Sequence, residues 1–408
     1  MKLNKLALTV AAGCAIVSTV QADTTFYISG STAYRKSTYA ALSAMYGAGI
    51  DVNYPIGDTS STATGSGAAN VVNTVGNGSA NLVWSGTPPT LGLGHVVVVC
   101  NWSGSISGQK ADAESALWPT FLAPGTTAGT ENFVPAVPDM NVSDNFQKTT
   151  TYFPPGDPAA VNLTRSAVAI IEFIVAKDPS APADLTDVSS LSLRQAYKLG
   201  YLNTAQLTGN AAENNTFLLP VGRDDDSGTR TIFEADNGIA FTATLLQWGL
   251  HSTVVDGTPG YTPYQFPLAS INANDGSGYA SGGTLAKVFN DATGPGTIVN
   301  PVTGAGNVTS YFIGYCSVTD ATGVIAPANF LNYNGVAWST AVVEEGQYTY
   351  WGYENVDVRP AHNNGATHTF YSALVTGEQG QAGVLAGTIA IGNMNCSRSA
   401  DGGLISHN

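Results

Sequence analysis

Short apolar runs alternate with stretches of helical periodicity along most of the chain. Residues 96–100 are uniformly apolar and β-branched or small, and residues 167–176 are nearly so, which is typical of strands buried on both faces. Further short strands are predicted at Thr25–Ile28, Asp139–Val142, Phe217–Gly222, Tyr311–Ser317 and Thr388–Ile391. Residues 56–80 and most of 119–165 are rich in small polar residues or proline and are expected to be loops.

Between these strands the spacing of apolar residues predicts helices. A helix over residues 33–46 should end at Gly47, and the tail has helical stretches between residues 367 and 386. The other helices are expected at 187–202, 229–237, 240–250 and 283–289, and a hairpin carrying Trp338 and Trp351 is expected over 335–351. Strands that alternate with helices favour an α/β fold over a sandwich.

Length and composition narrow the class of protein. A chain of 408 residues suits two lobes of ordinary size, and 43% hydrophobic residues can bury a core. Charged residues make up only 11%, and 46 glycines with many Ser, Thr and Asn residues take their place. This composition is also compatible with a second class of protein, a Gly/Ser/Thr-rich surface protein. The net charge is −14, and the sequence has neither the cluster of basic residues typical of nucleic-acid-binding proteins nor a polybasic membrane-binding segment. It does not exclude a small anion, because salt screens distant charge over about 8–10 Å.

The N-terminus has the pattern of a secretory signal. Met1–Lys5 is basic, Leu6–Val20 is apolar, and small residues precede a cleavage site after Ala22, so residues 1–22 are predicted to be removed. A lipoprotein box ending at Cys14 is the alternative. The mature protein is therefore expected to be periplasmic or extracellular.

The spacing of the remaining cysteines and the absence of common catalytic motifs argue against metal or redox chemistry. Cys100, Cys316 and Cys396 form no CxxC pair, and they are either buried small residues or include a Cys316–Cys396 bridge. HExxH, GxSxG and GxxxxGK[ST] are absent, and the five histidines are scattered. We therefore expect no metal, no cofactor and no enzymatic activity.

One segment has the chemistry of an anion site. After the strand at 217–222 come Arg223, three aspartates, and then Ser227, Gly228 and Thr229 at the start of a helix. The first N–H groups of a helix have no intrahelical partner, and its dipole is positive there, so the turn can hold an anion. The Arg223 guanidinium could reach the same anion with two hydrogen bonds.

Three other strand ends carry similar donors. Gly30 is followed by Ser31, Thr32 and Ala33 at a second helix start. Residues 102–108 form a hydroxyl-rich turn that contains Ser105, and Ser143 and Asp144 end a short strand. A carboxylate among such donors can accept the proton of monohydrogen phosphate but repels sulfate, which has no proton to donate. Asp144 is therefore predicted to select phosphate over sulfate.

The four motifs resemble the phosphate-binding proteins of bacterial phosphate ABC transporters, which are two-lobed periplasmic binding proteins. That family carries, in this order, a G-x-[ST] helix start, a G-S-x-x-G turn, an S-D strand end and R-x-x-x-S-G-T. The matching positions here are Gly30–Thr32, Gly104–Gly108, Ser143–Asp144, and Arg223 with Ser227–Thr229; Ile313–Tyr315 also resembles an I-G-Y strand of the family.

The resemblance implies an α/β fold of two lobes joined by two crossing hinge segments, with phosphate in the cleft between them. Lobe one would comprise residues 23–160 and 325–408, and lobe two residues 161–324. It implies an ABC permease as the membrane partner, a monomer, and a role in uptake or sensing. The phosphate-binding residues carried over are Ser31, Thr32, Ala33, Ser105, Asp144, Arg223, Ser227, Gly228 and Thr229.

Two departures from the family pattern bear on these residues. The gap between Ser105 and Asp144 is longer than usual, so residues 109–138 are expected to be an insertion, and Ala33 stands where the family often has an aromatic residue. Ser85–Gly86 could be mistaken for the S-D element of the family, but it precedes the Gly104 turn and has glycine in place of the aspartate. Asp144 is therefore preferred as the aspartate of that element. The alternatives are another oxyanion such as sulfate, a phosphate-handling enzyme, or a surface or matrix protein with a vestigial site.

Overall fold

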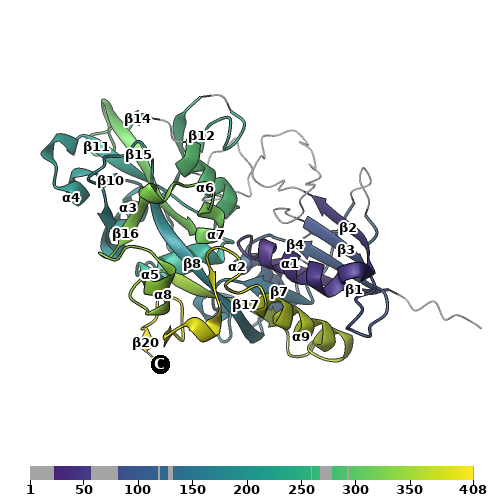
Figure 1. The fold of residues 1–408 in the computed structure, drawn as a ribbon. Helices are drawn as coiled ribbons and strands as arrows, with labels where there is room; N and C mark the ends of the chain where they lie inside the picture. Colours follow the sequence, from purple (N-terminus) through teal and green to yellow (C-terminus); the bar gives the residue numbers. More distant parts are fainter. Residues whose placement is uncertain are drawn as a thin grey trace, which may run out of the picture.

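A large mixed β-sheet forms the centre of the molecule (Figure 1), as seen in a computed structural model of the chain. The structure describes residues 23–56, 81–117, 120–126, 132–258, 260–266, 278–291 and 294–407. Along the main path of the sheet the strands follow in the order β10 (Leu202–Asn203), β11 (Thr216–Val221), β15 (Asn307–Ser317), β8 (Thr164–Lys177), β17 (Trp351–Val358), β7 (Met140–Ser143), β1 (Thr24–Gly30), β4 (Val96–Asn101), β3 (Asn81–Gly86) and β2 (Ile50–Ile56).

Shorter strands and the helices complete the described part of the chain. Strands that pair beside the main path are β14 (Gly296–Val299), β16 (Phe330–Tyr333), β9 (Asp187–Val188) and β18 (Thr388–Ile389). Separate pairs are β5 (Thr120–Leu122) with β6 (Phe133–Pro135), β12 (Trp248–His251) with β13 (Thr262–Gln265), and β19 (Cys396–Ser397) with β20 (Ser406–His407). The α-helices are α1 (Arg35–Tyr46), α2 (Ser105–Glu114), α3 (Ser190–Leu199), α4 (Ala205–Thr208), α5 (Gly228–Asp236), α6 (Gly282–Asp291), α7 (Val318–Ala321), α8 (Thr340–Glu344) and α9 (Gly365–Gln379).

Two antiparallel strands connect the two ends of the sheet. The first part of β8 pairs with β17, and its last residues, from Phe173 to Lys177, pair with β15. Figure 1 shows β1 to β4 with α1 and α9 on one side of these strands, and β10, β11, β14 and β15 with α6 on the other. The α/β class expected from the sequence is confirmed, whereas the lobe boundaries near residues 160 and 324 stay a prediction.

Separate apolar clusters stabilise the two sides. One contains Trp84, Val96 and Val98 of β4 and the stacked rings of Phe26 and Phe370, whose centroids are 4.4 Å apart. Another contains the apolar faces of β11, β15 and α6, including Phe289. Because β4 and the second half of β8 are buried on both faces, their sequences are apolar without alternation.

Three sequence predictions are wrong at the level of local structure. Residues 240–247 are not helical and lead into β12, because the Gln247 amide donates to the Arg223 carbonyl and the Trp248 indole donates to the Gly200 carbonyl. The predicted hairpin at 335–351 contains α8, whose first turn is capped by Ser339. Residues 105–114, expected to be a turn and the start of an insertion, form α2.

The other predicted strands and helices are present within a few residues, whereas β2, β3, β14, β16 and β17 were not predicted from the sequence. Cys100, Cys316 and Cys396 are buried and unbridged, so of the two alternatives the structure shows buried small residues and no Cys316–Cys396 bridge. The predicted signal segment 1–22, Cys14 and most of the predicted loop 56–80 lie outside the described residues. Within the described ranges, no helix is long and apolar enough to span a bilayer.

Candidate anion-binding site

The carboxyl ends of three parallel strands meet at one edge of the sheet. β1 lies between β4 and β7 and runs parallel to both. The Ser31 N–H donates to the Val142 carbonyl at 2.9 Å, and the Gly104 N–H donates to the Gly30 carbonyl at 2.9 Å. Three turns that are far apart in the sequence therefore lie together, at the kind of position where open α/β sheets bind ligands.

Glycine is required where these turns touch. Gly30 has φ of +138°, and a Cβ there would lie 1.9 Å from the Val142 carbonyl oxygen. Gly108, inside α2, faces it, and a Cβ on Gly108 would lie 3.0 Å from the Gly30 Cα. The absence of both side chains lets α2 pack directly on the end of β1, so that its first residue, Ser105, reaches the site.

A second pair of parallel strands brings in the Arg223 motif. β11 and β15 are parallel, and Arg223 follows β11 by two residues. The Ser227 side chain accepts the Arg230 N–H at 3.3 Å, which caps α5. This cap occupies the Arg230 N–H, which leaves the N–H groups of Gly228 and Thr229 for a ligand.

Asp144 connects α2 with α5. Its side chain is 1% exposed, and Ser105 Oγ donates a short hydrogen bond to Oδ1. Thr229 Oγ1 donates to Oδ2 at 2.7 Å. A Cβ on Gly228 would lie 1.9 Å from Asp144 Oδ1, so the start of α5 touches the carboxylate. The carboxylate therefore contacts the first turns of both helices.

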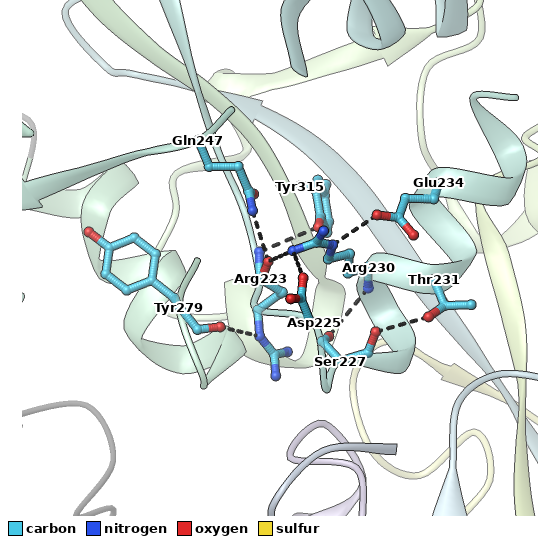
Figure 2. Close-up of polar contacts among 9 residues, drawn as sticks. All are labelled: Arg223, Asp225, Ser227, Arg230, Thr231, Glu234, Gln247, Tyr279 and Tyr315. Carbon is cyan, nitrogen blue, oxygen red and sulfur yellow. Dashed lines mark hydrogen bonds and ion pairs between the residues drawn. The ribbon is translucent and has the colours of Figure 1, made fainter. Parts of the chain in front are cut away.

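The Arg223 guanidinium is fixed by backbone carbonyls. Nε donates to the Tyr279 carbonyl at 2.9 Å, and Nη2 donates to the Ala280 carbonyl at 2.7 Å and to Thr32 Oγ1 at 3.1 Å. The Arg223 carbonyl in turn accepts hydrogen bonds from Gln247 and Arg230 (Figure 2). The guanidinium is thus oriented without a carboxylate partner among the described residues.

The aspartates between Arg223 and Ser227 have separate contacts. Asp225 pairs with Arg230 at 2.6 Å, and Arg230 also pairs with Glu234 at 2.9 Å (Figure 2). Burial, together with the neighbouring Asp225 carboxylate, raises the pKa of Asp226 to about 6. The ion pair of this turn therefore involves Arg230.

Two buried glutamates lie near the start of α1. Burial raises the pKa of Glu378 to about 8, and Ser37 Oγ donates to it at 2.5 Å. Burial also raises the pKa of Glu354 well above its usual range, and the charges of Glu378 and Asp144 add to this effect. Glu378 therefore cancels little of the positive charge of an arginine nearby at neutral pH.

All nine residues predicted for the site are buried. Their contacts form two groups: Asp144 with Ser105, Gly228 and Thr229, and Arg223 with Thr32. Ser31 and Ser227 hold the turns themselves, since Ser31 Oγ accepts the Ala33 N–H at 3.2 Å and Ser227 caps α5. Their role in ligand binding stays a prediction.

Sequence reasoning missed residues next to Arg223. A Cβ on Gly282, the first residue of α6, would lie 3.3 Å from Arg223 Nη1 and 2.1 Å from Asp320 Oδ2. Arg35 reaches the residue before this helix, with Nη2 3.4 Å from Ser281 Oγ. Residues 281–284, Ser-Gly-Gly-Thr, are a further Ser-Gly helix start at the beginning of an apolar helix, and this pattern in the sequence could have identified the start of α6 as part of the site.

No family model and no curated protein matches the sequence. Among solved structures, the chain is similar to a protein from Clostridium perfringens assigned as a phosphate ABC transporter substrate-binding protein with bound phosphate, at 12% identity and a TM-score of 0.47, over 90% of this chain and 99% of that one. It is also similar to an ABC-type phosphate transport receptor from Vibrio cholerae, at 13% identity and a TM-score of 0.43, over 86% of this chain and 93% of that one. The similarity by itself assigns no ligand to this chain.

Proposed function

We propose that this protein is an extracytoplasmic solute-binding protein that captures inorganic phosphate. The supporting observation is the arrangement around Asp144, a buried carboxylate held by the hydroxyls of Ser105 and Thr229. Arg223 and Thr32, a hydrogen-bonded pair from distant segments, come from two of the same four motifs. These motifs are the ones that resemble phosphate-binding proteins.

Each group has a defined task in this proposal. The N–H groups of Ser105 in α2 and of Gly228 and Thr229 in α5, with the Thr32 hydroxyl, donate to phosphate oxygens, and Arg223 supplies positive charge. Asp144 accepts the hydrogen bond from the proton of monohydrogen phosphate. Sulfate lacks that proton, so the same carboxylate repels it. Binding makes and breaks no covalent bond.

Closure of two lobes around the anion would exclude water from these groups and strengthen their hydrogen bonds. The Ile106 N–H donates to the Asp226 carbonyl at 3.0 Å, and this contact joins α2 to the turn before α5. We propose that residues 23–160 with 325–408 form one lobe and residues 161–324 the other. The closed form of a secreted monomer would then dock on a membrane permease or a sensor.

Isothermal titration tests the proposal most simply. The mature chain is unfolded, freed of anions and refolded, because bound phosphate can survive purification, and it is then titrated with phosphate and with sulfate at neutral pH. Phosphate binding without sulfate binding is expected. Tighter sulfate binding would keep an oxyanion site and overturn the role of Asp144. If neither anion binds, the chain is not a phosphate receptor, and self-association would favour the surface-protein alternative.

A further inference from the structure

The buried arginines of this chain fall into two groups. Each member of the first group pairs with a carboxylate: Arg230 with Asp225 at 2.6 Å, Arg359 with Asp112 at 3.4 Å and Arg398 with Asp236 at 3.0 Å. Arg35 and Arg223 make no ion pair in the described part of the chain, although they are 9% and 2% exposed. Burying a charge without a partner is unfavourable, so an unpaired arginine indicates a missing anion.

Arg35 has the less complete set of contacts. It is the first residue of α1, directly after the Gly30–Tyr34 turn. Nη2 is 3.4 Å from Ser281 Oγ, and Nη1 is buried with no hydrogen-bond partner. Buried nitrogen donors are almost always paired in native proteins, so this atom points to a ligand.

Arg35 and Arg223 flank the same helix start. Arg35 Nη2 would lie 3.7 Å from a Cβ on Gly283, and Arg223 Nη1 would lie 3.3 Å from a Cβ on Gly282. These glycines open the ten-residue helix α6, whose first N–H groups have no intrahelical acceptor. Asp320 is the carboxylate nearest this helix start, and it is engaged by Ser317 Oγ at 2.8 Å.

We propose that Arg35 is a second guanidinium that binds the oxyanion, together with the first turn of α6. This inference rests on the proposed function of the site. Arg223 and Asp144 carry charges that sum to zero, and the Asp320 carboxylate adds a negative charge at the start of α6. Arg35 balances that charge, and its attraction is stronger for a dianion, such as monohydrogen phosphate, than for a monoanion.

The test compares two neighbouring cations of α1. Arg35→Gln removes the proposed ligand, and Lys36→Gln removes the same charge from the next position, which is partly exposed. In titrations of the anion-free protein, Arg35→Gln should weaken phosphate binding about tenfold or more, and Lys36→Gln should change it less than about twofold. Arg35→Lys keeps the charge and should fall between them.

Thermal melts separate a binding role from a structural one. If Arg35 serves the ligand, Arg35→Gln should leave the melting temperature of the anion-free protein unchanged or higher, and should reduce the rise that added phosphate causes. A lower melting temperature with unchanged phosphate affinity would show that Arg35 is structural. If Arg35→Gln does not fold, Arg35→Lys provides the test. A phosphate affinity of Arg35→Lys equal to that of the wild type at every pH would overturn the proposal. Absence of oxyanion binding in the wild type would instead refute the proposed function itself.

Discussion

Replacing Asp144 by asparagine isolates the predicted basis of selectivity. The carboxylate accepts one hydroxyl hydrogen bond on each oxygen, from Ser105 and Thr229. Asparagine keeps one acceptor, and the hydroxyl that faces the new NH₂ group can rotate and accept instead. The variant should therefore fold, with a free energy of unfolding within about 1 kcal/mol of the wild type.

The expected change in binding is much larger than this change in stability. The carboxylate makes a charge-assisted hydrogen bond to the phosphate proton, and such bonds contribute about 1.5–3 kcal/mol. Since 1.4 kcal/mol is a factor of ten, the dissociation constant for phosphate should rise by about 10- to 100-fold in Asp144→Asn. Sulfate should bind more tightly than before, because its repulsion by the carboxylate is gone.

Titration calorimetry with both anions at neutral pH measures this change in selectivity. Asp226→Asn is the control, because this partly buried carboxyl, with a pKa of about 6, lies in the turn before α5, and its backbone carbonyl accepts the Ile106 N–H of α2. It should leave the ratio of phosphate to sulfate affinity unchanged. The reasoning is refuted if folded Asp144→Asn binds phosphate as the wild type does, or if both anions weaken equally.

Three further substitutions test the surrounding structure. Arg223→Lys cannot reproduce the three hydrogen bonds of the guanidinium, so calorimetry should show phosphate binding at least about tenfold weaker; unchanged affinity would remove Arg223 from the site. Gly30→Ala places a Cβ 1.9 Å from the Val142 carbonyl oxygen and should lower the free energy of unfolding by more than about 3 kcal/mol. Gly209→Ala is the control: Gly209 also has a positive φ, but its Cβ would meet open space, so the loss should be about 1 kcal/mol. Equal losses in denaturant titrations would contradict this reasoning. Glu378 has a pKa of about 8 in the folded protein and an ordinary value of 4.5, so the folded state binds more protons than the unfolded state between these pH values. The stability of the wild type should therefore fall as pH rises through that window. In thermal melts, Glu378→Gln should show a flatter pH dependence than the wild type, and an equally steep one would contradict this explanation.

The helix starts were predictable because their chemistry is local. Glycine, serine and threonine at a strand end specify a turn, a cap and exposed N–H groups, whatever the rest of the chain does. The Ser227 cap and the turn after Gly30 were found for this reason. The apolar runs of β4 and β8 were found because burial on both faces excludes most polar residues; Glu172 is the exception within the run of β8.

Other features depend on contacts between distant segments. α2 was missed because Gly108 and several polar residues interrupt its pattern; the glycine is there for packing on Gly30, and Gln109 and Asp112 are buried polar residues. The segment 240–250 has a helical pattern, but the hydrogen bonds of Gln247 and Trp248 outweigh local propensity. Arg35 was not singled out in the sequence, and only the arrangement of its neighbours shows that it has no carboxylate partner among the described residues.

A crystal structure of the refolded mature protein saturated with phosphate tests the central claim most directly. The account predicts one tetrahedral anion within hydrogen-bond distance of both the Asp144 carboxylate and the Arg223 guanidinium, with the first N–H groups of α5 directed at it. A phosphate bound elsewhere on the chain, with Asp144 still satisfied only by Ser105 and Thr229, would contradict the account.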